Sequence, residues 1–177
     1  MVRPFSLHDA AGVLAIYKPF IEDSGATFET VVPSLESFVE RMRLISERYP
    51  FFVWEEGGKI LGYAFATSHR ERIAYQWVVE TSVYVSEPGR GIGKVLYESL
   101  LAELSARGFV WAYGIITLPN HASLALHTHC GFEHFATYVH AGQKNGLWHD
   151  VVWVRKLLNP ATPQLPEPLF LSAQENA

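Results

Sequence analysis

The chain has 177 residues, enough for one domain with a full hydrophobic core. Hydrophobic residues make up 49% of it and charged residues 18%, so a folded globular protein is expected. The formal charge of -4 argues against a nucleic-acid-binding surface, and a single cysteine, Cys130, excludes an intrachain disulfide and a cysteine-rich metal site. The chain shows no signal-peptide pattern and no apolar run that could span a bilayer, so we expect a cytoplasmic protein without a membrane partner.

Two helices are predicted at the start of the chain. Apolar residues recur at helical spacing within residues 6–23. They recur again after Ser34, a candidate N-cap, and Pro50 ends this second helix. The stretch 23–33 between the two helices is expected to be a loop.

Strands dominate the chain after Pro50. Residues 51–66 form two apolar runs around the pair Gly57–Gly58, which predicts a β-hairpin. The later segments are predicted in this order: a strand at 77–86, a helix ending near Leu104, a strand at 109–118, a short helix at 120–130, and strands at 133–141 and 147–157. We therefore expect one α/β (α+β) domain over residues 1–158 with helices on both sides of a mixed sheet, followed by a proline-rich tail over residues 159–177 that is extended or disordered.

A glycine-rich turn, "SEPGRGIGK", joins a predicted strand to a predicted helix at residues 86–94. A Walker A loop requires glycine where Pro88 stands, and a Rossmann fingerprint requires glycine where Lys94 stands, so both are excluded. Backbone N–H groups at a helix N-terminus still favour an anion, and Arg90 and Lys94 add positive charge. The alternative is a tight turn that binds no ligand.

The segments around this turn resemble the GCN5-related N-acetyltransferases (GNAT). "VYVSEPGRGIGKVLYESLL" is similar to their strand, acetyl-CoA pyrophosphate turn and helix, although Pro88 replaces the usual Gln or Arg and the turn is shorter. "PNHASLALHTHCGF" is similar to a second motif, from Asn120 to Phe132. Further segments, among them "ERIAYQWVVETSVYV" and "NGLWHDVVWV", resemble the phosphinothricin and methionine-sulfone acetyltransferases within that superfamily.

This resemblance implies a GNAT acyl-CoA N-acyltransferase fold with a mixed central sheet of about seven strands flanked by helices. It implies an enzyme that transfers the acetyl group of acetyl-CoA to the α-amino group of a small amino acid such as phosphinothricin, methionine sulfone or methionine sulfoximine, by direct attack in a ternary complex. It also implies a homodimer. The spacing of His127 and His129 is poor for metal ligands on a helix, so no metal is expected. The cofactor-binding residues that the resemblance implies are Val83, Val85, Arg90, Gly91, Ile92, Gly93, Lys94, Asn120 and Ser123.

Glu80 is the candidate general base. Strand alternation puts Glu80, Ser82 and Tyr84 on one face of their strand, and a carboxylate among apolar residues is expensive to bury unless it is paired or used. Acetylation of an amine requires a group that removes the ammonium proton, and the resemblance assigns this role to Glu80. The alternative is an edge-strand carboxylate in water.

His127 is the candidate acid for the departing thiolate. It stands seven residues after Asn120, where many acetyltransferases carry a tyrosine with that role, and histidine holds or relays a proton near neutral pH. The alternative is a helix histidine bonded to a backbone carbonyl. Asn120 itself either bonds the pantetheine arm, as the resemblance implies, or caps the helix. Cys130 has no evident activating partner, so no acyl-enzyme is expected.

The resemblance implies an acceptor pocket in which Arg72 and Tyr75 are the anchors, because arginine grips oxyanions bidentately. For Arg70 and Arg72, a position in a solvated loop without a binding role is an equal alternative. Other functions also stay open: an acetyltransferase for a polyamine or a protein N-terminus, or a non-catalytic CoA-binding module, which Glu80 argues against. The acceptor residues carried over from the family are Phe28, Arg70, Arg72, Tyr75, Ser82 and Val151.

Overall fold

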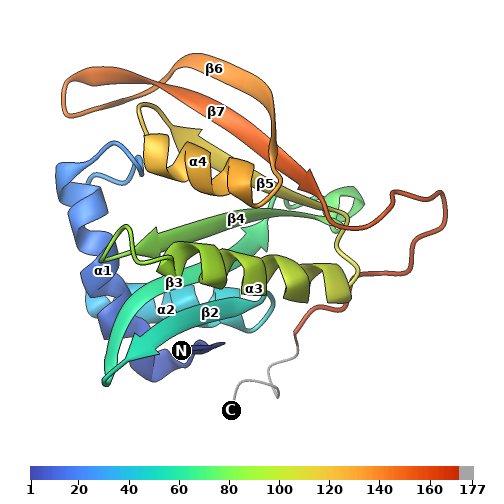
Figure 1. The fold of residues 1–177 in the computed structure, drawn as a ribbon, viewed down its shortest axis with the longest axis horizontal. Helices are drawn as coiled ribbons and strands as arrows, with labels where there is room; N and C mark the ends of the chain where they lie inside the picture. The colour runs from blue at the N-terminus through green and yellow to red at the C-terminus, as the bar shows by residue number, and fades with distance from the viewer. Residues whose placement is uncertain (172–177) are drawn as a thin grey trace.

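One mixed sheet runs through the molecule, with its strands in the order β1-β2-β3-β4-β5-β7-β6 (Figure 1). The computed structural model describes residues 1–171. β4 and β5 are parallel, and the other neighbouring pairs are antiparallel. The strands are β1 Val2–Pro4, β2 Phe51–Glu56, β3 Lys59–Ser68, β4 Val78–Val85, β5 Trp111–Thr117, β6 Glu133–Lys144 and β7 Leu147–Leu157.

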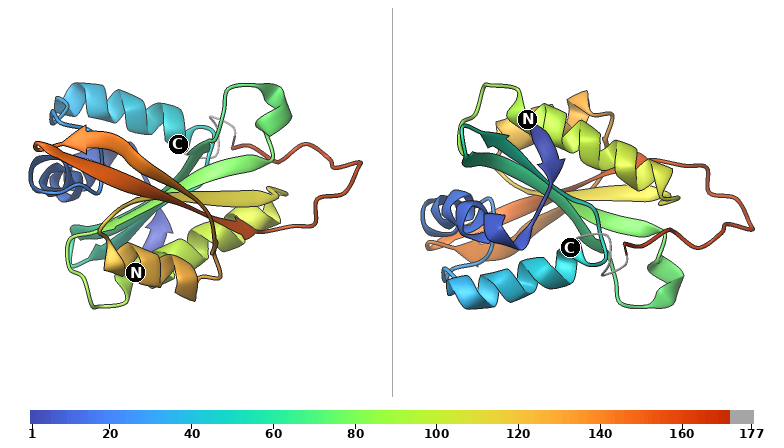
Figure 2. Two further views of the ribbon diagram at one scale, coloured as in Figure 1. Left: turned by 90° about the horizontal axis from the view of Figure 1, so that it is seen from above. Right: turned by 90° about the horizontal axis from the view of Figure 1, so that it is seen from below.

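Helices cover both faces of this sheet (Figure 2). On one face lie α1 (Ala10–Asp23) and α2 (Leu35–Ser46), and on the other lie α3 (Ile92–Ala106) and α4 (His121–His129). Each layer buries its own core, because the apolar stripe of each helix packs on the sheet. Val13 and Phe38 belong to the first core, and Leu96 and Leu100 to the second. The predicted helices and strands after residue 6 are all present.

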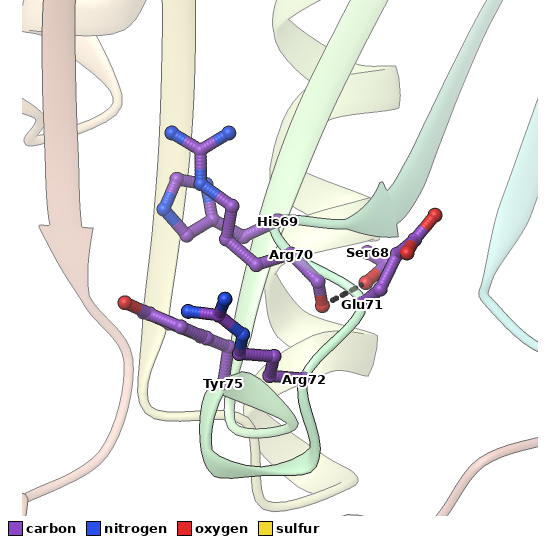
Figure 3. A pocket seen from close by; sticks show the side chains of 6 residues that line it. All are labelled: Ser68, His69, Arg70, Glu71, Arg72 and Tyr75. Carbon is purple, nitrogen blue, oxygen red and sulfur yellow. Dashed lines mark hydrogen bonds between the residues drawn. The ribbon is translucent and has the colours of Figure 1, made fainter.

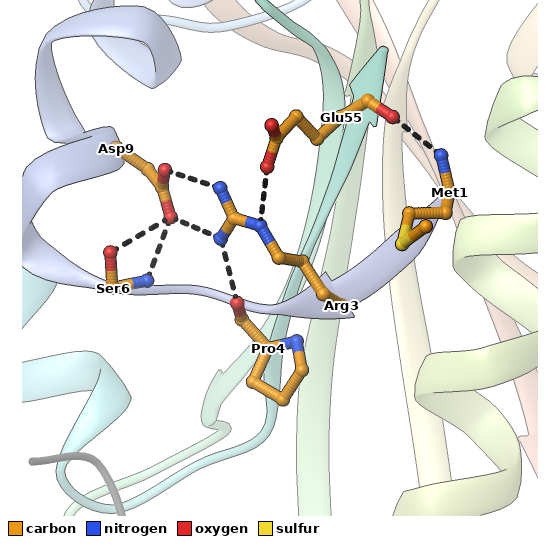
Figure 4. Close-up of polar contacts among 6 residues, drawn as sticks. All are labelled: Met1, Arg3, Pro4, Ser6, Asp9 and Glu55. Carbon is orange, nitrogen blue, oxygen red and sulfur yellow. Dashed lines mark hydrogen bonds and ion pairs between the residues drawn. The ribbon is translucent and has the colours of Figure 1, made fainter. Parts of the chain in front are cut away.

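The strand β1 is absent from the sequence-based prediction. It has three residues and pairs with β2, so it is too short to carry a periodic signal. Tertiary ion pairs hold it: the Arg3 guanidinium contacts Asp9 at 2.7 Å and Glu55 at 2.7 Å (Figure 4). These contacts join segments far apart in sequence, which local pattern does not reveal.

The parallel strands β4 and β5 separate part of the way along their length. Val78, Val79 and Glu80 pair with residues 111–113, but the rest of β4 and β5 has no mutual pairing. The gap opens directly after Glu80. This separation creates the space for the candidate site.

The tail after β7 packs back on the domain. Residues 158–171 contain no helix or strand, and the ring of Phe170 lies 5.7 Å from Tyr49 and 5.6 Å from Phe109. Trp77 Nε1 donates to the Pro166 carbonyl at 2.8 Å. The described part of the tail is therefore extended and anchored, and residues 172–177 of the predicted tail lie outside the described residues. Within residues 1–171, no helix is both long and apolar enough to cross a membrane.

Candidate active site

A cavity of about 510 Å³ occupies the gap between β4 and β5. Its walls come from the end of β4, the glycine-rich turn, the end of β5 and α4. Most of the sequence-predicted cofactor residues meet here, although they come from distant segments. Those that line the cavity are Val83, Val85, Gly91, Gly93, Lys94, Asn120 and Ser123.

The glycine-rich turn presents a helix N-terminus to this cavity. Gly91 is the N-cap of α3, and Gly89 and Gly91 have φ angles of +86° and +75°, a left-handed conformation that favours glycine. The first N–H groups of a helix have no acceptor within the helix, and the helix dipole adds partial positive charge there. The predicted turn and its capacity for an anion are therefore supported by the backbone geometry.

Two of the predicted cofactor residues, Arg90 and Ile92, do not line the cavity. The Arg90 guanidinium forms ion pairs with Glu87 at 2.6 Å and with Glu56 at 2.9 Å, so acidic side chains already offset its charge. The side chain of Ile92 is 2% exposed and belongs to the core beneath α3. This side chain is therefore not available to a ligand.

Asn120 caps α4, as local chemistry predicts. Its Oδ1 accepts a hydrogen bond from Ser123 N at 3.0 Å, and both residues line the cavity. The cap fixes the first turn of α4 against the cavity wall. The same side chain thus shapes the helix and faces the space between β4 and β5.

Glu80 lies on a central strand, so the edge-strand alternative is wrong. β4 is flanked by β3 and β5, and the Glu80 side chain is 27% exposed. The predicted alternation is confirmed: Thr81 bonds to Tyr97 of α3, whereas Tyr84 packs on Phe20 of α1 on the opposite face. Glu80 Oε1 lies 2.8 Å from His69 Nδ1.

His127 stands at the end of a buried hydrogen-bonded chain. Thr81 Oγ1 lies 2.7 Å from Tyr97 Oη, which lies 2.9 Å from His127 Nε2. His127 Nδ1 is 2.8 Å from the Ser123 carbonyl, so the backbone bond expected of an ordinary helix histidine is present. His127 and Thr81 also line the cavity, which an ordinary helix histidine need not do.

The partners of His127 define its protonation. A carbonyl only accepts, so Nδ1 carries a proton and donates to Ser123. In the neutral ring, Tyr97 donates to Nε2 and Thr81 donates to Tyr97. In the imidazolium, Nε2 donates to Tyr97, Tyr97 to Thr81, and Thr81 to the Tyr113 carbonyl at 3.0 Å. Every donor therefore has an acceptor in both protonation states.

Burial favours the neutral form of this histidine. His127 is 5% exposed, and loss of hydration lowers its pKa below the ordinary value, opposed in part by the bond to Ser123. The ring also approaches β5 closely: a Cβ at Gly114 would lie 2.6 Å from His127 Nε2. Glycine at position 114 is thus required by the position of the imidazole.

A second cavity, of about 540 Å³, collects part of the predicted acceptor site. Arg70, Arg72 and Tyr75 line it together with His69. Ser68 and Glu71 complete the lining, which belongs to the loop after β3 and to η2 (Ile73–Tyr75). In Figure 3 the carboxylate of Glu71 points away from the other charged side chains. Both arginines are exposed at the surface, so the loop is solvated and also forms a cationic cavity.

The remaining predicted acceptor residues lie apart from the arginines. Ser82 lines the cofactor cavity and a further cavity of about 260 Å³ beneath α1 and α2. Phe28 packs against Gly142 of the β6–β7 hairpin, where a Cβ would come within 2.5 Å of its ring. Val151 is buried in β7 opposite Thr117. The structure thus brings three of the six together in one cavity.

Sequence reasoning missed three polar residues that contact the candidate catalytic groups. His69 contacts Glu80, and Thr81 and Tyr97 continue the chain from His127. The pairing of β3 with β4, in which Thr67 lies opposite Glu80, is what places His69 near Glu80. That pairing is known from the structure and not from the sequence. Thr81 and Tyr97 resemble ordinary strand and helix residues.

Cys130 does not line the cavity between β4 and β5. Cys130 is 6% exposed, and burial raises the pKa of its thiol, which disfavours the nucleophilic thiolate. Among the described residues, no group of three or more His, Cys, Asp or Glu side chains is placed to hold a metal ion.

Comparison with known proteins assigns a family to these features. The profile of the acetyltransferase (GNAT) family matches residues 17–132. A phosphinothricin N-acetyltransferase of Streptomyces viridochromogenes is 36% identical over 95% of this chain and 93% of its own length. An L-methionine sulfoximine/L-methionine sulfone acetyltransferase of Pseudomonas aeruginosa is 31% identical over 90% of this chain and 95% of its own. The crystal structure of a GNAT phosphinothricin acetyltransferase from Sinorhizobium meliloti in complex with AcCoA has a TM-score of 0.89 and 32% identity, over 94% of this chain and 92% of its own.

Proposed function

Because the chain belongs to the GNAT acetyltransferase family, we propose that it acetylates the α-amino group of a small amino acid such as phosphinothricin, methionine sulfone or methionine sulfoximine. The chain is an acetyl-CoA-dependent N-acetyltransferase by family. The observation that carries the choice of acceptor is the similarity, over nearly the whole chain, to enzymes named for these compounds. Reaction by direct attack in a ternary complex suits a site in which the one cysteine is buried.

The cavity between β4 and β5 is the proposed acetyl-CoA site. The N-terminus of α3 and Lys94 supply the positive potential that the pyrophosphate requires. The separated edges of β4 and β5 leave backbone groups unpaired, and the pantetheine arm is expected to bond to them. Asn120 and Ser123 stand on the opposite wall, at the start of α4.

The cationic cavity beside Glu80 is the proposed acceptor site. Arg70 and Arg72 suit an amino acid with a carboxylate and a second oxygen-rich group, because guanidinium groups bind such oxyanions in pairs of hydrogen bonds. The same two charges disfavour a polyamine, which carries only positive groups. Arg72→Ala is expected to raise the acceptor KM, and an unchanged value would contradict this assignment.

Glu80 and His127 are the proposed general base and general acid. Glu80 removes a proton from the acceptor ammonium, and the free amine attacks the acetyl carbonyl. The attacking nitrogen loses its second proton to water as the carbon–sulfur bond breaks, and the thiolate takes a proton from the chain in which His127, Tyr97 and Thr81 are linked. Water then returns a proton to that chain. Thr81 and His127 both face the cofactor cavity, which supports this role.

A homodimer is part of the proposal. The β6–β7 hairpin exposes large apolar side chains, including Tyr138 at 54%, Val139 at 68%, Leu147 at 64% and Trp148 at 60%. Apolar side chains gathered on one hairpin are typical of protein interfaces. A monomer mass from light scattering at micromolar concentration would remove this prediction. Location in the cytoplasm, with neither nucleic acid nor membrane as a partner, stays a prediction from the sequence.

A screen of CoA release tests the function. The panel contains phosphinothricin, methionine sulfone, methionine sulfoximine, methionine, spermidine and a peptide with a free N-terminus. We expect the three oxygen-rich amino acids to give kcat/KM values at least about tenfold above methionine, because methionine lacks the oxygens that hydrogen-bond in the cavity. Fastest release with spermidine or the peptide would contradict the proposal.

A further inference from the structure

His69 connects the acceptor cavity to Glu80. It follows β3 directly and lines the cavity with Arg70, Arg72 and Tyr75. Its Nδ1 lies 2.8 Å from Glu80 Oε1, and its side chain is only 11% exposed. A half-buried carboxylate and a nearly buried imidazole thus meet beside the proposed acceptor site.

Aromatic rings from three elements hold the imidazole in place. Its centroid lies 4.9 Å from the ring of Tyr113 in β5, 5.8 Å from Tyr75 in η2 and 6.0 Å from Trp153 in β7. All three contacts are edge-to-face, with interplanar angles of 73°, 74° and 82° respectively. The ring is therefore confined to one orientation, with Nδ1 directed at Glu80.

The contact has a defined direction when Glu80 is ionised. A carboxylate only accepts, so Nδ1 carries the proton and donates to Oε1. Within residues 1–171, Glu80 Oε2 and His69 Nε2 have no hydrogen-bond partner. The bond thus leaves one oxygen of Glu80 free to take a proton, while it restricts rotation of the carboxylate.

We propose that His69 is a positioning residue that orients the Glu80 carboxylate for proton removal from the acceptor. The inference rests on the proposed function, in which Glu80 is the base. A base must lie within hydrogen-bond reach of its proton, and a freely rotating carboxylate meets this condition for only part of the time. The charged and titratable groups around the pair are Arg70, Glu71, Arg72, Tyr75 and Tyr113.

Two substitutions at position 69 separate hydrogen bonding from packing. His69→Phe keeps a ring among the aromatic neighbours and removes the donor, whereas His69→Asn restores an N–H near the position of Nδ1. We expect His69→Phe to lower kcat by about 10- to 100-fold, the usual worth of a hydrogen bond to a charged group, with the acetyl-CoA KM unchanged. His69→Asn should recover most of this loss. His134→Phe is the matched control, because it removes an exposed imidazole that bonds to the hydroxyl of Thr137, which is distant from Glu80.

The pH profile of kcat and a double variant distinguish a positioning role of His69 from a purely structural role. Without the Nδ1 donor the ionised carboxylate loses support, so the rising limb of kcat against pH should move to higher pH in His69→Phe. Glu80→Gln combined with His69→Phe should be no slower than Glu80→Gln alone. Melting temperatures of all the variants establish that they are folded.

The outcomes distinguish failure of this inference from failure of the proposed function. If Glu80→Gln is slow while His69→Phe keeps the wild-type kcat, only the role of His69 is wrong. A folded His69→Asn as slow as His69→Phe would also overturn it, because the imidazole would then do more than donate one bond. If Glu80→Gln retains its rate, the proposed base is wrong and this inference is overturned with it.

Discussion

The two faces of β4 differ in how they hold their polar groups. Glu80 and Thr81 are neighbours in sequence, yet they point to opposite sides of the sheet. On the side of Glu80, polar groups border an open cavity, and atoms such as His69 Nε2 keep free hydrogen-bonding capacity within the described residues. On the side of Thr81, the chain through Tyr97 to His127 is buried and fully bonded, although Thr81 and His127 also line the cofactor cavity.

This difference follows from burial. A polar group removed from water must find a protein partner, so the buried side has one complete set of hydrogen bonds. An open cavity lets water or a ligand satisfy the groups, so the other side can accept different molecules. We infer that β4 separates a rigid proton-donating side from an adaptable proton-accepting side. Four predictions test this comparison.

The largest effect is expected at Glu80. Glu80→Gln keeps the shape of the side chain and removes its basicity, so kcat should fall by roughly 10²–10⁴, the usual share of general base catalysis. Both KM values should stay close to wild type. The deficit should shrink as pH rises, because more of the amine is then neutral without help. Near wild-type kcat at neutral pH would make Glu80 structural, and His127 would be the next candidate for the base.

A smaller loss is expected at His127. His127→Ala should lower kcat by about 10- to 100-fold, below the upper range for acid–base catalysis, because water can donate to the thiolate instead. His129→Ala on the same helix is the control, since that residue is exposed. The double variant with Glu80→Gln should be additive in ΔΔG‡, because the two groups share no partner. Strong non-additivity would show that the faces of β4 are coupled.

Tyrosine-to-phenylalanine variants on the two sides of β4 should differ in their free energy of unfolding. Tyr97 is fully buried and bonds to both Thr81 and His127, so Tyr97→Phe should lower the free energy of unfolding by about 1–2 kcal/mol. Tyr75 is 41% exposed, and Tyr75→Phe should change the free energy of unfolding by less than about 0.5 kcal/mol. Urea unfolding of both variants measures the difference. Equal costs would mean that the buried chain contributes nothing beyond packing.

The smallest effect is a pH dependence of stability. Burial lowers the pKa of His127 in the folded protein, so the unfolded chain binds its proton more readily. The contribution of the neutral ring is therefore complete above the unfolded pKa of about 6.5 and is lost as pH falls below it, by at most about 1.4 kcal/mol per pH unit.

Chemical denaturation between pH 7.5 and 5 measures this slope. Wild type should lose stability faster than His127→Phe as the pH falls, and His129→Phe should behave as wild type. Equal slopes for wild type and His127→Phe would contradict a buried neutral His127.

The sequence by itself determined the elements other than β1 and the side on which strand residues face. The two-residue period of a strand separates Glu80 from Thr81 without any tertiary information. The glycines within residues 86–94 mark a turn before a helix, and Asn120 marks the start of a short helix. These features depend on residues close together in the chain, so local chemistry is sufficient to predict them.

The tertiary structure decided which side chains meet. The chain Thr81–Tyr97–His127 joins a strand and two helices across 46 positions, and His69 reaches Glu80 only through the register of β3 with β4. The separation of β4 from β5 and the placement of Phe28 and Val151 away from the arginines likewise depend on packing. Such contacts arise when apolar faces are buried together, and burial also decides whether a polar group keeps water or must find a partner.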